Sequence, residues 1–380
     1  MANLVVLQIV DKHFLACPTK YTDESGFLAA PLKKSLAKEY TKASADHTLN
    51  SIRELEGLRK NAVGRTLDKT ETSIETLYRY YDQLGSLESK IPSVGYQIPF
   101  RWNNAFDKSG IFASTRNLTH ASLAFERICV LFNAAAMMTQ VASVQEVDSD
   151  DGLKIAQKYF QLSSGVFQYI KDHVHAVIPQ DPTPDFSQNT LEALGQLMLA
   201  QAQEVCFMKA AKDKMKETVI AKVAAQTSDF YANATKLMQK DTARSCWDKE
   251  WIPLVASKHH GYIAMAHYYQ SLSHKASQEF GEELGHLTIA MNEIIASRKQ
   301  FDNVHWPFRN AELIIQKAYE SAKRDNDFIY HVVVPEAKNL APIARASLVK
   351  QLQPVFPLSQ NFHELFVPLV PNPTSSCIIS

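Results

Sequence analysis

The histidines are the residues whose spacing comes closest to a catalytic or metal centre, and that spacing argues against one. His173 and His175 are two residues apart, so on a helix they point in nearly opposite directions and do not share a metal ion. His259 and His260 are adjacent and have the same problem. No G-x-S-x-G, G-x-x-x-x-G-K-[ST] or H-E-x-x-H motif occurs. We therefore expect no catalytic residues, no metal site and no cofactor, and a helical enzyme is the least favoured interpretation.

The cysteines indicate a reducing compartment. They are five in number, scattered and without a C-x-x-C pair, which is untypical of a disulfide framework or a zinc site. The N-terminal run has no basic leader. Its residues Leu4 to Val10 are rich in β-branched side chains, which favours a strand. No apolar stretch approaches the ~20 residues of a membrane-spanning helix. We expect a cytoplasmic protein.

A cluster of lysines is the strongest positive patch. It surrounds a predicted turn between two helices and comprises Lys209, Lys212, Lys214, Lys216 and Lys222. Val219 and Val223 lie among these lysines, four residues apart and so on one helix face. The patch is either the solvated rim of a helical hairpin or a surface for an acidic amphipathic helix or an anionic membrane. The two valines are either core residues or the floor of a groove, and their spacing does not decide between these alternatives.

The last four residues, Cys377-Ile-Ile-Ser380, match a prenylation motif. Serine in the last position favours a farnesyl group on Cys377, and the polar residues before it suit access by a transferase. A single lipid gives only weak, reversible membrane attachment. An unmodified tail is the alternative.

The elements that position these residues are predominantly helical. Lys+Arg and Asp+Glu are equal at 40 each, which argues against nucleic acid as a partner, and only 12 glycines are present. Helical periodicity predicts helices over Asp46–Asn61, Thr70–Leu87, Leu118–Val144, Gly152–Val177, Leu191–Lys214, Glu217–Lys240, Ile252–Phe280 and Glu282–Phe301. Consecutive long helices with short turns predict stacked antiparallel hairpins of tetratricopeptide type. After Asn326, FIYHVVVP favours β-structure, and a proline-rich tail should lie extended on the surface.

Several stretches together resemble the Bro-one domain family, closest to its Alix branch. They include RKNAVGRTLDKTETSIETLYRYYDQL, FRWNNAFDKSGIF, SLAFERICVLFNAAA, DDGLKIAQKYFQLSSGVF, MLAQAQEVCFMKAAKDKMKETVIAKVAAQ and KRDNDFIYHVVVPE. The resemblance implies a mainly α, boomerang-shaped domain over residues 1–366, with a tetratricopeptide-like hairpin solenoid core and a small β element near the N-terminus. Residues 367–380 would be an extended tail. A lone domain ending in a prenylation motif resembles the Brox branch in architecture.

The resemblance also implies a function. It implies a non-enzymatic ESCRT-III adaptor whose concave groove binds the C-terminal amphipathic helix of charged multivesicular body proteins, in endosomal sorting, budding, abscission or membrane repair. It also implies that this cytoplasmic protein is recruited to endosomal and other membranes. The corresponding groove positions are Cys206, Val219 and Val223 for apolar contacts, and Asp150 and Lys154 for polar ones. Asp150 and Lys154 are also spaced as an i,i+4 acid–base pair, so a surface salt bridge is their alternative role.

The same groove positions depart from the family pattern. Relatives have an aromatic residue in place of Cys206 and longer aliphatic residues in place of the two valines, so we expect weaker binding or an altered partner. The alternative function is a signalling scaffold that uses the groove for a partner outside ESCRT-III. Phe112 matches an exposed loop residue implicated in membrane contact, and Tyr330 a phosphorylated tyrosine; without the resemblance, Tyr330 would be a tyrosine buried in a strand.

Overall fold

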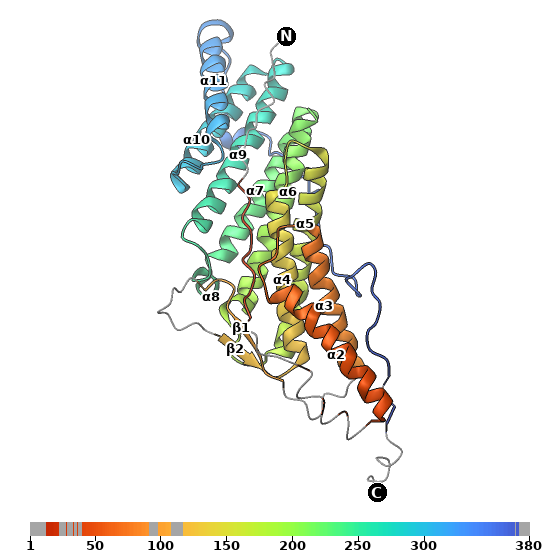
Figure 1. Ribbon diagram of the computed structural model, residues 1–380. Coiled ribbons are helices and arrows are strands. Elements are labelled where there is room, and N and C mark those ends of the chain that lie inside the picture. The colour runs from red at the N-terminus through yellow and green to blue at the C-terminus, as the bar shows by residue number, and fades with distance from the viewer. Residues whose placement is uncertain are drawn as a thin grey trace. The chain divides into compact units, whose positions relative to one another are not determined.

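The computed structural model describes residues 13–22, 28, 33, 36, 40–90, 98–107, 117–368 and 370–371. Within these residues the protein is mainly α-helical, as predicted (Figure 1). The long helices are α2 (Lys42–Val63), α3 (Glu71–Lys90), α4 (Leu123–Val144), α5 (Asp150–Val177), α6 (Gln188–Lys212), α7 (Glu217–Met238), α9 (Trp251–Ala276), α10 (Phe280–Gln300) and α11 (Arg309–Asp325). A short helix α8 (Asp241–Arg244) and two strands, β1 (Phe100–Asn103) and β2 (Asn117–His120), complete the main elements. The strand predicted over Leu4 to Val10 lies outside the described residues.

The chain divides into two compact units. The first contains residues 1–16, 142–164 and 192–351, and the second contains residues 17–141, 165–191 and 352–380. Each unit has its own core of apolar side chains, and each is described by itself below.

In the second unit, a buried carboxylate ties together the elements around α4. Glu126 accepts hydrogen bonds from Arg59 Nε at 2.9 Å, from Tyr80 Oη at 2.8 Å and from Trp102 Nε1 at 2.6 Å. These donors come from α2, α3 and β1, and all four side chains are buried. A buried charge is tolerated only when it is paired and hydrogen-bonded, and Glu126 meets that condition. The two strands form an antiparallel ribbon, so the predicted helix over Leu118–Val144 begins only at Leu123.

In the first unit, helical hairpins stack as the sequence predicts. Helix α7 packs against α9, and α9 packs against α10. One helix was predicted over Ile252–Phe280, but α9 ends at Ala276 because Gln278 adopts a left-handed conformation with φ of 62° and the chain turns into α10. Helix α11 follows α10 and lies beside it (Figure 1).

The β-structure favoured after Asn326 is wrong. Residues Asn326–Tyr330 form a single π-helical turn at the end of α11, and His331 is left-handed with φ of 52°. The Asn326 side chain then bonds both the N–H and the C=O of Val332, at 3.0 and 3.1 Å. That amide satisfies the backbone groups a neighbouring strand would have satisfied, so the β-branched residues remain in irregular structure.

The described part of the proline-rich C-terminal segment, residues 352–368, contains no helix or strand, and side chains hold its backbone in the second unit. Asp82 of α3 accepts hydrogen bonds from the N–H groups of Leu358 and Ser359, at 3.0 and 2.7 Å. Gln83 accepts one from the Leu365 N–H, and Ser51 of α2 donates one to the Leu365 carbonyl. The segment is therefore part of the folded unit.

Helix α4 is the one helix of the described residues long and apolar enough to cross a membrane, contrary to the expectation that no such stretch exists. In the structure 78% of its apolar window is buried inside the protein. We assign α4 as the central helix of a core.

Candidate functional site

The predicted groove residues come from three helix ends within the first unit. Asp150 and Lys154 lie in the first turns of α5, Cys206 lies near the end of α6, and Val219 and Val223 lie in the first turns of α7. Helices α6 and α7 are joined by a tight turn at residues 213–216, in which Lys214 adopts a left-handed conformation with φ of 53°.

The polar rim of the site is built around Asp150. Its Oδ1 atom accepts hydrogen bonds from Lys212 Nζ at 2.6 Å and Lys209 Nζ at 3.3 Å, which joins α5 to the last turn of α6. Hydrogen bonds from Lys212 and then Lys209 lower the pKa of the Asp150 carboxyl. The i,i+4 pairing of Asp150 with Lys154 is wrong, because Lys154 Nζ lies instead 3.9 Å from Asp151. Lys154 and Asp151 are both largely exposed.

The apolar floor of the site is more closed than the groove hypothesis requires. Val223 is only 1% exposed and Cys206 is 7% exposed. Val219 is partly exposed, one turn nearer to the lysine-rich turn. Val223 is therefore a core residue, and Val219 is the member of this trio with substantial surface for a partner. Burial raises the pKa of the Cys206 thiol to about 12, so this side chain acts as a small neutral apolar residue.

A second segment of the first unit crosses the same three helices. The Ala346 N–H donates to the Lys222 carbonyl of α7, and its carbonyl accepts from Gln203 Nε2 of α6 at 2.8 Å. The Leu348 N–H donates to Gln203 Oε1 at 3.0 Å, and the Lys350 N–H donates to Gln161 Oε1 of α5. Leu348 is 54% exposed. Its backbone is held by Gln203, three residues before Cys206, so Leu348 is an exposed apolar side chain on a segment that lies far from α6 in the sequence.

A buried ion pair fixes the helices under this site. Lys258 Nζ of α9 lies 2.9 and 2.8 Å from the two carboxylate oxygens of Glu204, and Tyr231 of α7 donates to the same carboxylate. Burial lowers the pKa of Lys258, although Glu204 opposes that shift. Glu204 is two residues before Cys206, so this network fixes the position of α6 relative to α7 and α9.

The remaining predicted residues have different outcomes. Tyr330 is 40% exposed, and its ring stacks on Phe280 with the centroids 3.8 Å apart. It is therefore not the strand-buried tyrosine that the local sequence alone would suggest. Phe112 and Cys377 lie outside the described residues. No group of histidine, cysteine or acidic side chains that could hold a metal ion is found among the residues that the structure describes.

Stacked helical hairpins that present three helix ends, with a charged rim and an apolar floor, are typical of helical protein-binding domains. The family model of the BRO1-like domain matches residues 14–376. The chain therefore belongs to the BRO1-like domain family, which confirms the resemblance.

Relatives and solved structures agree with this assignment. The chain is 44% identical to programmed cell death 6-interacting protein of Xenopus laevis over 370 residues, covering 96% of this chain and 42% of the relative. It is 32% identical to human tyrosine-protein phosphatase non-receptor type 23, covering 90% of this chain and 21% of that protein. The solved "ALIX BRO1 CHMP4C complex" superposes with a TM-score of 0.85 at 43% identity, covering 93% of this chain and 99% of that one. The chain thus spans about two fifths of the length of the first of these relatives.

Proposed function

We propose that this protein is a non-enzymatic ESCRT-III adaptor. Its ligand is the C-terminal amphipathic helix of a charged multivesicular body protein, which lies across the ends of α5, α6 and α7. The observation that carries the proposal is the likeness to a BRO1 domain that was solved in complex with CHMP4C. The ion pairs of Asp150 with Lys209 and Lys212, which join the start of α5 to the last turn of α6, support it. The proposed location is cytoplasmic, with recruitment to endosomal and other membranes.

The charges of the rim support an oriented helical ligand. The carboxylate of Asp150 is already neutralised by two lysines, while Lys154 at the first turns of α5 is largely exposed. Charged groups at the edge of an interface fix register and accelerate association more than they add affinity. Lys209 also pairs with Asp213 at 2.8 Å, so the α6 lysines are already paired. The largely exposed Lys154 therefore favours a ligand with an acidic residue on the flank that faces α5.

The affinity resides in the apolar contacts. Val219 and the exposed Leu348 are the side chains with surface to offer, and Cys206 contributes only its edge. Val223 is covered, and Cys206 offers less apolar surface than an aromatic residue at that position would. Each Å² of apolar contact area lost in this way weakens binding by ~25 cal/mol. We expect binding in the micromolar range or weaker.

The substitution Val219→Asp tests the proposal. Fluorescence anisotropy with a labelled peptide of the CHMP4C C-terminal helix should show saturable binding to the native chain and a loss of at least about tenfold in the variant. Val304→Asp is the matched control, because Val304 is a valine of the same unit that is 77% exposed. Equal binding by both variants would place the ligand elsewhere.

The closed floor also supports a second candidate function. In it, the protein is a signalling scaffold that uses the same surface for a partner outside ESCRT-III. A surface with little exposed apolar area discriminates against leucine-rich helices. Failure of the native chain to bind several charged multivesicular body peptides at high micromolar concentration would favour this function.

Further parts of the proposal concern attachment and modification. A farnesyl group on Cys377 would give weak membrane association, and mass spectrometry of the intact C-terminal peptide tests it. Phe112 is proposed as a loop contact with a membrane or partner. Tyr330 is proposed as a phosphorylation site: phosphorylation would add charge to a ring that now stacks on Phe280.

A further inference from the structure

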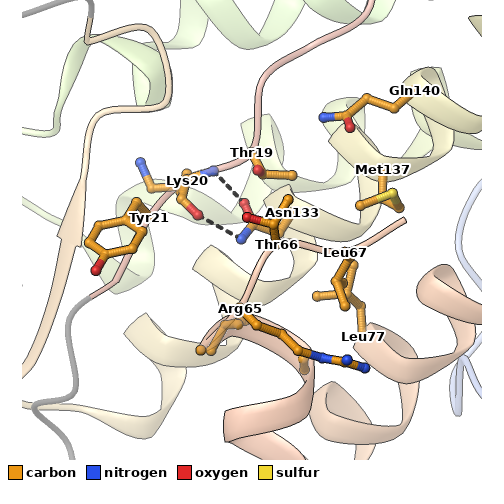
Figure 2. A pocket seen from close by; sticks show the side chains of 13 residues that line it. Thr19, Lys20, Tyr21, Arg65, Thr66, Leu67, Leu77, Asn133, Met137 and Gln140 are labelled. Atoms are coloured by element: carbon orange, nitrogen blue, oxygen red, sulfur yellow. Dashed lines mark hydrogen bonds between the residues drawn. The ribbon is translucent and has the colours of Figure 1, made fainter. Parts of the chain in front are cut away.

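The second unit contains a cavity of about 350 Å³ that the proposed function does not use. Its walls are the segment at residues 19–21, the end of α2 with the loop that follows it at residues 62–67, Leu77 of α3 and two turns of α4 (Figure 2). All of these elements belong to the second unit, whereas the adaptor surface lies in the first.

The wall formed by the segment at residues 19–21 is rigidly held. Asn133 of α4 accepts a hydrogen bond from the Lys20 N–H at 2.6 Å and donates one to the Lys20 carbonyl at 2.9 Å (Figure 2). Gln140 donates to the Cys17 carbonyl at 3.0 Å. Because Asn133 is buried and satisfied on both sides of its amide, the segment does not need a ligand to hold its position.

The lining combines apolar and polar side chains. Leu77 and Met137 are fully buried and Leu67 is partly buried, so together they provide an aliphatic base. The hydroxyl groups of Thr19 and Thr66 also belong to the lining. A large aliphatic side chain fits such a base, and the polar groups suit the backbone of a peptide that carries it.

The charged side chains of the lining are all positive. Arg65 is exposed at the cavity, and the described lining residues include no acidic side chain. The other lining cation, Lys20, is buried with its ammonium group paired to Asp185, so it is not available to a ligand. Arginine and tyrosine are the residue types that contribute most to peptide interfaces, and the exposed Tyr21 lies at the same cavity.

We propose that this cavity binds a short extended peptide segment in which an aliphatic residue is flanked by carboxylates. The aliphatic side chain occupies the base formed by Leu67, Leu77 and Met137, and a flanking carboxylate pairs with Arg65. An arginine–carboxylate pair is a charge-assisted contact, which is stronger than a neutral hydrogen bond. The cavity thus gives the domain a second peptide site independent of the adaptor surface.

The test uses the full chain labelled with ¹³C at the methionine methyl groups, because the Met137 methyl reports directly on the base of the cavity. The probe is the peptide acetyl-Asp-Leu-Glu-amide. Acetyl-Asn-Leu-Gln-amide removes its charges, and acetyl-Asp-Gly-Glu-amide removes its aliphatic side chain. The substitution Met137→Leu assigns the reporting signal. We expect the probe to shift the Met137 signal saturably and both other peptides to bind at least about fivefold more weakly.

Two variants separate the charge from the shape of the site. Arg65→Gln should weaken binding of the probe at least about fivefold, to the level of the uncharged peptide. Arg53→Gln is the control, because Arg53 is an exposed arginine on α2, and it should change binding of the probe by less than about twofold. Thr66→Trp should block the cavity without changing any charge. An unshifted Met137 signal, equal binding of the uncharged peptide, or full binding by Arg65→Gln would each overturn the proposal. None of these outcomes depends on the CHMP4C measurement.

Discussion

Acidification should destabilise the first unit through a pair of histidines between α9 and α10. His267 Nδ1 and His286 Nδ1 lie 2.8 Å apart, so one ring donates a hydrogen bond and the other accepts it. The accepting ring must be neutral for this bond, because its protonation would place two N–H groups against each other. Burial lowers the pKa of His267 to about 4 and that of His286 to about 3.

The sign and size of the effect follow from these values. An unfolded histidine binds its proton near pH 6.5, so between pH 6.5 and pH 4 the unfolded chain holds protons that the folded chain does not. The contribution is complete above pH 6.5 and is lost as the pH falls through that window. Each pH unit is worth about 1.4 kcal/mol per histidine, so lowering the pH from 7 to 5 should cost about 2 kcal/mol for each ring.

The neighbouring charges do not reverse this expectation. Glu293 raises the pKa of His267, while Arg345 and burial lower it; His267 and His274 both lower the pKa of His286. The outer pairs of the same interface, His260 with Glu293 at 2.7 Å and His274 with Glu279 at 2.6 Å, each join a histidine to a carboxylate. In the central pair, His267 with His286, burial lowers the pKa of both partners.

Urea unfolding at pH 7, 6 and 5, followed by circular dichroism, measures the effect. The double variant His267→Gln/His286→Gln keeps a neutral hydrogen-bonded pair and should lose about 2 to 4 kcal/mol less than the native chain over this range. His47→Gln, on an exposed face of α2, is the control and should behave like the native chain. If the double variant and the native chain lose the same free energy, the burial argument is incorrect.

Three other predictions follow from the packing. Lys258→Met should cost about 3–5 kcal/mol of unfolding free energy because it leaves the Glu204 carboxylate buried without its partner, and the added change Glu204→Leu should recover most of that loss in the same urea assay. Tyr80→Phe should cost about 1–3 kcal/mol by removing one buried donor to Glu126, and an unchanged denaturation midpoint would contradict this. Gly165→Ala should destabilise the second unit by more than about 1 kcal/mol, because the new Cβ would lie 1.9 Å from the Leu352 carbonyl oxygen. Gly57→Ala in α2 has open space around it and should stabilise the protein by about 0.5–1 kcal/mol. Thermal melts of both variants measure these changes.

Helix positions could be predicted from sequence because they depend on local periodicity. Helix α7 begins at Glu217, as predicted, and the predicted α2 and α3 differ from the observed helices only at their ends. The errors arise where a distant or local side chain satisfies the backbone instead. The run after Asn326 has the composition of a strand, but the Asn326 amide takes the hydrogen bonds of Val332.

The candidate site could be predicted only in part. The sequence resemblance brought the helix ends of Asp150, Cys206 and Val219 together, but it did not predict which side chains are covered. Burial of Val223 depends on tertiary packing, and the contribution of Leu348 depends on a crossing by a segment more than a hundred residues away. Likewise the partners of Asp150 come from α6 and not from the i,i+4 position, so local spacing predicted the wrong lysine.

The C-terminal segment also sets how far the domain can be trimmed. A chain that stopped at residue 351 would leave the Asp82 carboxylate without its two amide donors and remove the ring that stacks on Tyr81, Phe356. Proteolytic shortening or gene fusion near this position would therefore damage α3 and its neighbours, although the cut falls in a stretch with no helix or strand. Expressed forms should keep the chain at least to Phe366, whose buried side chain is the last large apolar group in the described part of the second unit's core.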